Sequence, residues 1–399
     1  MKKRVSVATL ALTAVVGTAL ATTAPAASAA STAPLPPLKP DLLRTAISGL
    51  PNATVTGAMV KVAGPAGKWQ GTSGVGNIET KEPVLADGSF RIGSTSKVIT
   101  AAVILQLVAE HRVDLDQSVQ HYLPGTLPAS YPKITVRQVL NHTSGLPAGN
   151  LGYGDAQWYV DHHLQSWTLQ EIVADAVKNP MAFPPGSKQY YNGTNYFVAG
   201  LLIEKVTGRS YGDEVRRRII RPLHLRHTYA LDRDDVRLPG PHAHGYVAVT
   251  ENGTTTLHDV SEQSPWPSSE GGLISTTADL TRFVNALFRG HVVPRPQLRE
   301  MFTTPDVPYA DGSQCNIGPD AGRACYSVGM TKTTLPNGVT VWGKTGSRPG
   351  YTSGMFATRD LRRTVVYSMT PTGNKDGSEG PYVQKIAAAV FDPDLLSGG

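Results

Sequence analysis

The chain has 399 residues, of which 40% are hydrophobic and 17% charged, the balance of a soluble globular protein with a large core. Its 40 glycines and 30 prolines are spread along the sequence, so they indicate many loops and give no low-complexity argument for disorder. The formal net charge is only +6, and no basic run is longer than residues 216–218, which argues against a nucleic-acid partner.

The first 29 residues have the pattern of a secretory signal peptide. Lys2, Lys3 and Arg4 precede an apolar stretch that ends at Leu20, and residues 27–29 supply small side chains for cleavage. Small polar residues interrupt the stretch, which favours a cleaved signal over a membrane anchor. We therefore expect an extracellular protein without stable membrane insertion. Cleavage removes three basic residues and no acidic ones, which lowers the charge from +6 to +3.

The elements that follow change character twice along the chain. A Pro-rich linker (residues 30–40) leads into the folded part, in which the patterns predict elements over the following residues. Helices are predicted at 41–48, 95–111, 136–142, 169–178, 195–206, 211–220, 277–289, 296–302 and 383–391, and strands at 54–62, 68–74, 339–343, 354–357 and 364–369. Strands at both ends with helices between them predict one domain (41–391). Its sheet part (about 41–110 and 265–391) is split by a mainly helical part (about 111–264).

Residues 94–97 (Ser-Thr-Ser-Lys) form the first motif with chemical potential. They follow a Gly-containing turn and open the helix predicted at 95–111. Residues i and i+3 share a helix face, so the Ser94 hydroxyl and the Lys97 amine can approach hydrogen-bond distance. A serine needs an adjacent base to become nucleophilic, and a lysine can be that base only if burial or positive charge lowers its pKa.

Two further motifs complete a candidate site. Residues 344–346 (Lys-Thr-Gly) follow a predicted strand, where Lys344 and Thr345 can bind a substrate carboxylate while the glycine leaves room for the substrate backbone. Tyr191 lies in a Gly- and Asn-rich segment, and two flanking lysine ammoniums would lower the pKa of its phenol so that it moves protons near neutral pH.

These three motifs, in this order, resemble the serine β-lactamase and penicillin-binding-protein superfamily. The similarity is greatest to the class C β-lactamase branch and its secreted D-alanyl-D-alanine carboxypeptidases. Stretches at 90–94, 115–119, 134–146, 199–208 and 271–276 resemble the carboxypeptidases as well, so the similarity runs from about residue 41 to about 391. The resemblance implies an α/β (α+β) fold in which helices flank a central antiparallel sheet, with an inserted helical domain.

The resemblance also implies roles for individual residues. Ser94 would be acylated, and Lys97 and Tyr191 would manage protons. Lys344 and Thr345 would bind the substrate carboxylate. The backbone N–H groups of Ser94 and Ser347 would form the oxyanion hole.

One position departs from the family pattern. The second family motif is Tyr-x-Asn, whose Asn side chain contacts the substrate amide, and here Gly193 stands where that Asn is expected. A one-residue shift would instead align Tyr190 and Asn192 with the motif, but it requires an insertion before a packed helix. With Tyr191 as the family tyrosine, one hydrogen bond to the substrate is missing, which favours other acyl substrates.

Metals, cofactors and partner proteins are not expected. Cys315 and Cys325 are an even pair at close spacing in an exported chain, which predicts a disulfide and leaves too few ligands for a structural zinc site. His242 and His244 have no third ligand nearby in the sequence, and no nucleotide-binding fingerprint is present. We expect a monomer with small-molecule or peptide substrates.

The sequence thus predicts a D-alanyl-D-alanine carboxypeptidase that acts on exported cell-wall peptides and is trapped by penicillins and other β-lactams. Two alternatives remain open. One is another hydrolase on the same scaffold: a β-lactamase, an esterase or a D-amino-acid peptidase. The other is a penicillin-sensing or penicillin-binding module that is acylated without turnover.

Overall fold

The structure, a computed structural model, describes residues 33–396. The predicted signal peptide lies outside these residues. A six-stranded sheet organises the described part, and neighbouring strands are antiparallel throughout in the order β2-β1-β10-β9-β8-β7. The strands are β1 (Val55–Ala63), β2 (Trp69–Gly74), β7 (Thr331–Thr334), β8 (Thr340–Arg348), β9 (Tyr351–Thr358) and β10 (Thr364–Pro371). The predicted α/β fold with a central antiparallel sheet is confirmed.

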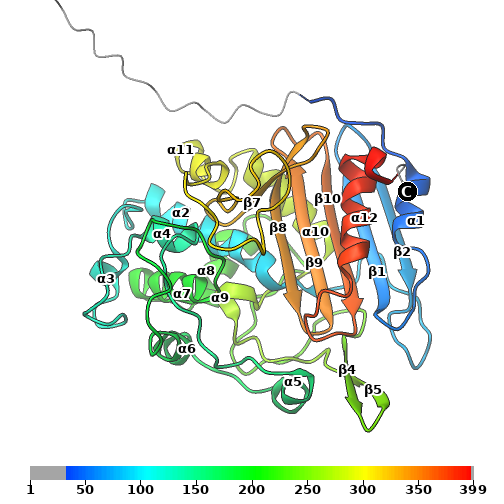
Figure 1. The fold of residues 1–399 in the computed structure, drawn as a ribbon, viewed down its shortest axis with the longest axis horizontal. Coiled ribbons are helices and arrows are strands. Elements are labelled where there is room, and N and C mark those ends of the chain that lie inside the picture. Colours follow the sequence, from blue (N-terminus) through cyan, green and yellow to red (C-terminus); the bar gives the residue numbers. More distant parts are fainter. Residues whose placement is uncertain (1–32, 397–399) are drawn as a thin grey trace, which may run out of the picture.

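Helices cover both faces of this sheet (Figure 1). On one face, α1 (Pro40–Ala46) and α12 (Gly380–Phe391) pack on each other and share a core with β1, β8 and β10. On the other face, α10 (Thr277–Phe288) packs against β1, β9 and β10. Alternate side chains of a strand point to opposite faces, so the same strands supply both cores.

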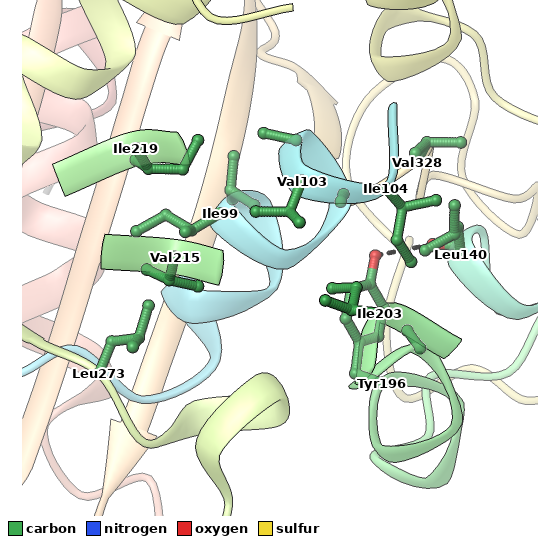
Figure 2. Close-up of a cluster of buried hydrophobic side chains, with 14 of the residues drawn as sticks. Ile99, Val103, Ile104, Leu140, Tyr196, Ile203, Val215, Ile219, Leu273 and Val328 are labelled. Carbon is green, nitrogen blue, oxygen red and sulfur yellow. Dashed lines mark hydrogen bonds between the residues drawn. The ribbon is translucent and has the colours of Figure 1, made fainter. Parts of the chain in front are cut away.

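Helix α2 (Ser96–Ala109) joins the sheet to the helical part of the molecule. Every side chain from Ser96 to Leu105 is buried, and α2 contacts α7, α8 and α9 on one side and β8 on the other. Figure 2 shows Ile99, Val103 and Ile104 of α2 among buried side chains that include Ile203 of α7 and Val215 of α8. A helix buried all round holds its first turn rigidly, and that turn follows Ser94 directly.

Most of the remaining elements are short, and α7 is the exception, with 14 residues. The other helices are α3 (Val119–Tyr122), α4 (Val136–Leu140), α5 (Ala156–His162), α6 (Leu169–Ala176), α7 (Thr194–Thr207), α8 (Tyr211–Val215), α9 (Ser268–Gly271) and α11 (Arg295–Leu298). A π-helical turn (Arg216–Ile220) extends α8, and 3₁₀ turns lie at Gly93–Thr95, Arg299–Phe302 and Pro393–Leu396. Two small sheets pair β3 (Phe90–Arg91) with β6 (Ile274–Ser275) and β4 (Tyr246–Glu251) with β5 (Thr254–Asp259).

All of the predicted helices and strands have a counterpart, but α3, α5, α9, β3, β6 and β7 were not predicted, and two further differences are notable. The hairpin β4–β5 has no predicted equivalent, although Asn252 and Gly253 form its two-residue turn with φ values of 49° and 78°. Such an Asn-Gly turn is a strong hairpin signal. The strand predicted at 339–343 is longer, since β8 continues through Arg348 and contains the Lys-Thr-Gly motif. Within residues 33–396, no helix has the length and apolar character needed to cross a membrane.

Candidate active site

The turn that carries Ser94 is clamped between two sheets. The backbone N–H of Ile92 donates to the carbonyl of Leu273 (3.0 Å), and the Ser353 hydroxyl on β9 donates to the Ile92 carbonyl (2.8 Å). Gly93 has φ = 50°, and a Cβ there would lie 2.5 Å from the backbone nitrogen of Ser347. Only a glycine lets the turn approach β8 so closely. The two N–H groups proposed for the oxyanion hole therefore lie on backbones in direct contact.

Lys97 lies where the helical spacing predicts. Its Nζ atom is 3.0 Å from the Ser94 Oγ atom, and its side chain is fully buried while Ser94 is half-buried. Burial lowers the pKa of Lys97, and the nearby carboxylate of Glu270 opposes this shift. The sequence-predicted pair thus comes together in the structure.

Lys344 and Thr345 lie on a free edge of the sheet. Strand β7 pairs with β8 only as far as Gly343, so the edge of β8 beyond that residue has no strand partner in the described part of the chain. Burial and the charge of Lys97 lower the pKa of Lys344 to about 7, although Glu270 raises it. Its Nζ atom donates to the Thr345 carbonyl (3.1 Å), and Thr345 itself is exposed. An unpaired edge with a cation beside it suits an extended substrate that ends in a carboxylate.

Tyr191 lies between the two lysines. The Nζ atoms of Lys97 and Lys344 are 5.1 and 4.6 Å from the centre of its ring. The hydroxyl is buried and makes no well-oriented hydrogen bond to residues 33–396, although it lies near enough to Ser94 for that side chain to act against the rise in the phenol pKa. The expected lowered pKa is wrong, since burial, and then Glu270, raise the pKa of Tyr191 well above its usual range. Desolvation disfavours a phenolate, so Tyr191 keeps its proton in this site.

The structure favours Tyr191 over Tyr190 as the family tyrosine. Tyr190 is exposed, and its ring packs near Tyr309. Asn192 is buried and structural, because its Nδ2 atom donates to the Leu146 carbonyl (2.7 Å) and its Oδ1 atom accepts from the backbone of Thr194 (2.8 Å). The shifted alignment would therefore assign substrate binding to an asparagine that is already used.

Gly193 opens a space that other groups fill. A Cβ at this position would lie 3.4 Å from the Cγ and Oε1 atoms of Glu270 and 3.5 Å from the Tyr153 hydroxyl. The space vacated by the family Asn side chain is therefore bordered by a carboxylate from α9 and a phenol from the 150–155 loop.

Glu270 is the residue of the site that sequence reasoning missed. It lies on the four-residue helix α9, and its carboxylate forms a close ion pair with Lys97. Its Oε1 atom also accepts a hydrogen bond from the Ser94 hydroxyl (3.3 Å). Burial would raise the pKa of Glu270, but Lys97, with smaller contributions from Lys375 and Arg348, lowers it below its ordinary value. A single Glu in a turn 173 residues from its partner carries no sequence signal.

His142 supports Tyr191 from behind. Its ring lies 4.6 Å from the Tyr191 ring, and its Nδ1 atom accepts from the backbone N–H of Asn192 (3.3 Å) and from the Asn195 amide (3.3 Å). Burial, together with the charges of Lys97 and Lys344, lowers the pKa of His142 well below its usual value. A neutral imidazole therefore fixes the segment that carries Tyr191.

Within residues 33–396, no group of three or more potential ligands could hold a metal ion.

The disulfide between Cys315 and Cys325 is confirmed, and its loop is tied to the site. The Gln189 side chain donates to the carbonyls of Asn141 (2.7 Å) and Tyr326 (2.8 Å) and accepts from the backbones of Cys325 (2.9 Å) and Tyr326 (3.0 Å). Tyr326 in turn stacks on Tyr191 at 5.0 Å.

Replacing both cysteines with serine is expected to lower the free energy of unfolding by about 2–3 kcal/mol, because the unfolded chain gains the entropy of one short loop. The rate of acylation should change little, since Gln189 still holds Tyr326. Urea unfolding and labelling with a fluorescent penicillin measure the two effects. The chain has only these two cysteines, so reductant should destabilise the wild type and leave the double variant unaffected. Equal stability of the two proteins would contradict this prediction.

Comparisons with known proteins agree with this geometry. A family model described as "Beta-lactamase" matches residues 43–389. The chain is 27% identical to "Penicillin-binding protein 4*" of Bacillus subtilis over 79% of this chain and 67% of that protein. It spans only 45–48% of the length of some other curated relatives that it matches.

Two solved structures are similar over nearly their whole length. A D-stereospecific amidohydrolase from Streptomyces sp. is 33% identical, with a TM-score of 0.74 over 88% of this chain and 98% of that one. A D-amino acid amidase from Ochrobactrum anthropi, complexed with L-phenylalanine amide, is 25% identical, with a TM-score of 0.72 over the same shares.

Proposed function

Because the chain belongs to the beta-lactamase family of serine hydrolases, we propose that it removes the carboxyl-terminal residue of D-alanyl-D-alanine peptides through an acyl-enzyme on Ser94. In this reaction the Ser94 oxygen attacks the carbonyl carbon of the penultimate residue. The carbonyl oxygen becomes an oxyanion between the N–H groups of Ser94 and Ser347. The C–N bond then breaks, the terminal D-alanine leaves with a proton, and water hydrolyses the ester.

The observation that carries this proposal is the excess of positive charge beside the nucleophile. Lys97, Lys344, Lys375 and Arg348 all act electrostatically on this site, and Glu270 is the one carboxylate that they share. Arg348 is committed to Gln263 and to the Ser264 carbonyl, whereas Lys344 lies at the unpaired edge of β8. A substrate that ends in a carboxylate complements this field.

Replacing Lys344 with glutamine is expected to lower kcat/KM for acetyl-D-Ala-D-Ala about 10- to 100-fold, since a hydrogen bond to a charged group is lost. The same peptide with a carboxamide end has no such bond and should lose much less. The ratio of the two kcat/KM values is therefore the readout. Lys61→Gln on β1, separated from β8 by two strands, is the matched control and should change neither substrate. An equal loss for acid and amide would refute a carboxylate-binding role for Lys344.

The lowered pKa of Lys344 should make the binding of a free carboxylate depend on pH. With a pKa of about 7, its ammonium is present below neutral pH and is lost as the pH rises through this value. The KM of the free-acid peptide should therefore rise above pH 7, whereas that of the carboxamide should stay nearly constant.

A second candidate is a D-amino-acid amidase, which the similarity to two such amidohydrolases favours. A D-phenylalanine amide cleaved faster than acetyl-D-Ala-D-Ala would support it. Rapid turnover of a chromogenic cephalosporin would indicate a β-lactamase, and preference for a short-chain ester an esterase. A stable penicillin adduct without release of D-alanine would favour the sensor.

We also propose that the protein acts outside the cell, because residues 1–29 have the pattern of a secretory signal peptide.

A further inference from the structure

The hydrogens of Lys97 are fully used in this site. A lysine ammonium carries three N–H donors and no acceptor. The Lys97 Nζ atom donates to the Ser94 oxygen (3.0 Å), to the Glu270 carbonyl (2.9 Å) and, in a close ion pair, to the Glu270 Oε1 atom. Its side chain is fully buried, so water replaces none of these partners. The Glu270 carboxylate favours the ammonium form of Lys97 against the effect of burial, and an ammonium has no lone pair left to receive a proton from Ser94.

The Ser94 hydroxyl has the Glu270 carboxylate and the Tyr191 phenol as further neighbours. Its oxygen accepts from Lys97, and it donates to the Glu270 Oε1 atom at 3.3 Å. Tyr191, the other ionisable neighbour of Ser94, keeps its own proton because burial raises the pKa of its phenol. Among residues 33–396, the Glu270 carboxylate is thus the basic group that receives the hydrogen of Ser94.

We propose that Glu270 is the catalytic base of this enzyme and that Lys97 stays cationic throughout the reaction. The inference rests on the proposed acyl-enzyme function. As the Oγ–C bond forms, the Ser94 proton moves to the Glu270 Oε1 atom and the carbonyl π electrons move to the carbonyl oxygen. When the C–N bond breaks, the proton passes from Glu270 to the leaving nitrogen. In deacylation a water molecule gives its proton to Glu270, attacks the ester, and the departing Ser94 oxygen takes that proton back.

The surroundings of Glu270 suit this role. Lys97 on α2, Lys375 on the 372–379 loop and Arg348 on β8 face the carboxylate and keep it ionised, whereas burial favours its neutral form. The carboxylate in turn raises the pKa of the neighbouring phenols Tyr191 and Tyr153, which keep their protons. The Lys97 charge also stabilises negative charge that develops on the Ser94 oxygen. Gly193 borders the carboxylate, since a Cβ there would lie 3.4 Å from its Oε1 atom, in ordinary van der Waals contact.

The test compares Glu270→Gln and Glu270→Asp in the full chain. Acylation is followed as the burst of nitrophenol from p-nitrophenyl acetate and as labelling by a fluorescent penicillin, between pH 4 and pH 9. Glu270→Gln should lower the acylation rate about 10²- to 10⁴-fold, the usual contribution of a positioned base. Its residual activity should depend on neutral Lys97, so the acidic limb of the pH profile should move upward by several units. Glu270→Asp keeps a carboxylate and should recover part of the rate.

Specific outcomes would overturn the assignment. If Lys97 were the base, loss of the carboxylate would lower the Lys97 pKa further, and Glu270→Gln would acylate at the wild-type rate at pH 8–9. If Glu270 only filled space, Glu270→Asp would be no faster than Glu270→Gln. Glu262→Gln, which alters an exposed glutamate, is the matched control. Release of D-alanine is measured in parallel, so failure of the carboxypeptidase proposal is seen separately from failure of the base.

Discussion

Replacing Ser94 with alanine is expected to abolish covalent labelling by penicillin and to lower ester hydrolysis by at least about 10³-fold, the scale of loss when a serine nucleophile is removed. The neighbouring hydroxyls cannot take its place. The Ser96 hydroxyl donates to the Gly93 carbonyl (2.7 Å), and the Thr95 hydroxyl bonds to the Lys344 carbonyl and to Ser353, both at 3.3 Å. Both side chains are fully buried, whereas Ser94 is half-buried at the mouth of the helix.

Intact-mass spectrometry after incubation with penicillin measures this result directly. Ser347→Ala serves as the control, because only the backbone of Ser347 is assigned a role and this variant should still form the adduct. An adduct on Ser94→Ala would show that the nucleophile lies elsewhere.

The relation between Ser94 and Lys97 could be predicted from the sequence because it is local. Two residues three positions apart on a helical turn must lie near each other whatever the rest of the chain does. The helix itself was recognised from one apolar face, although the structure buries α2 on all sides. The predicted helix is nevertheless correct, because the apolar face seen in the pattern is one of the buried faces of α2.

Glu270 could not be predicted because its contact with Lys97 depends on how α9 packs against α2. Helix α9 has four residues and follows Pro265 and Pro267, so neither hydrophobic periodicity nor an N-capping side chain indicates it in the sequence. The prediction of a lowered pKa for the Tyr191 phenol was wrong for a related reason. From the motifs alone, only the two lysines are expected to act on the pKa of the phenol. Its burial and its proximity to Glu270 arise only when the chain folds.

The predicted end of the strand before Lys344 was also wrong, because it too depends on pairing in the folded chain. The Val-rich pattern stops at Gly343, but β9 continues to pair with β8 as far as Arg348. Pairing on one edge extends a strand past its apolar residues. The motif is therefore not a loop after a strand but part of its unpaired edge, and this placement makes the edge available to a substrate.

Replacing Gly346 with alanine is expected to lower acylation about 100-fold or more without touching any side chain of the site. A Cβ at this position would lie 1.9 Å from the Ile92 carbonyl and 2.9 Å from the Thr95 nitrogen, both in the turn that carries Ser94. These atoms belong to the backbone and cannot rotate away, so β8 and the turn must separate. A displacement of about 1 Å between reacting groups is enough for a loss of this size.

The cost in stability should be about 1–3 kcal/mol, as for other overpacked sites, so the protein should remain folded. Burst kinetics with p-nitrophenyl acetate and thermal unfolding measure the two effects together. Gly312→Ala is the matched control, because a Cβ at Gly312 meets nothing within 4 Å. If Gly346→Ala lowered stability but acylated like Gly312→Ala, the join between β8 and the turn would not position the nucleophile. Since the oxyanion donors are assigned to these two backbones, a normal rate would also remove Ser347 from the oxyanion hole.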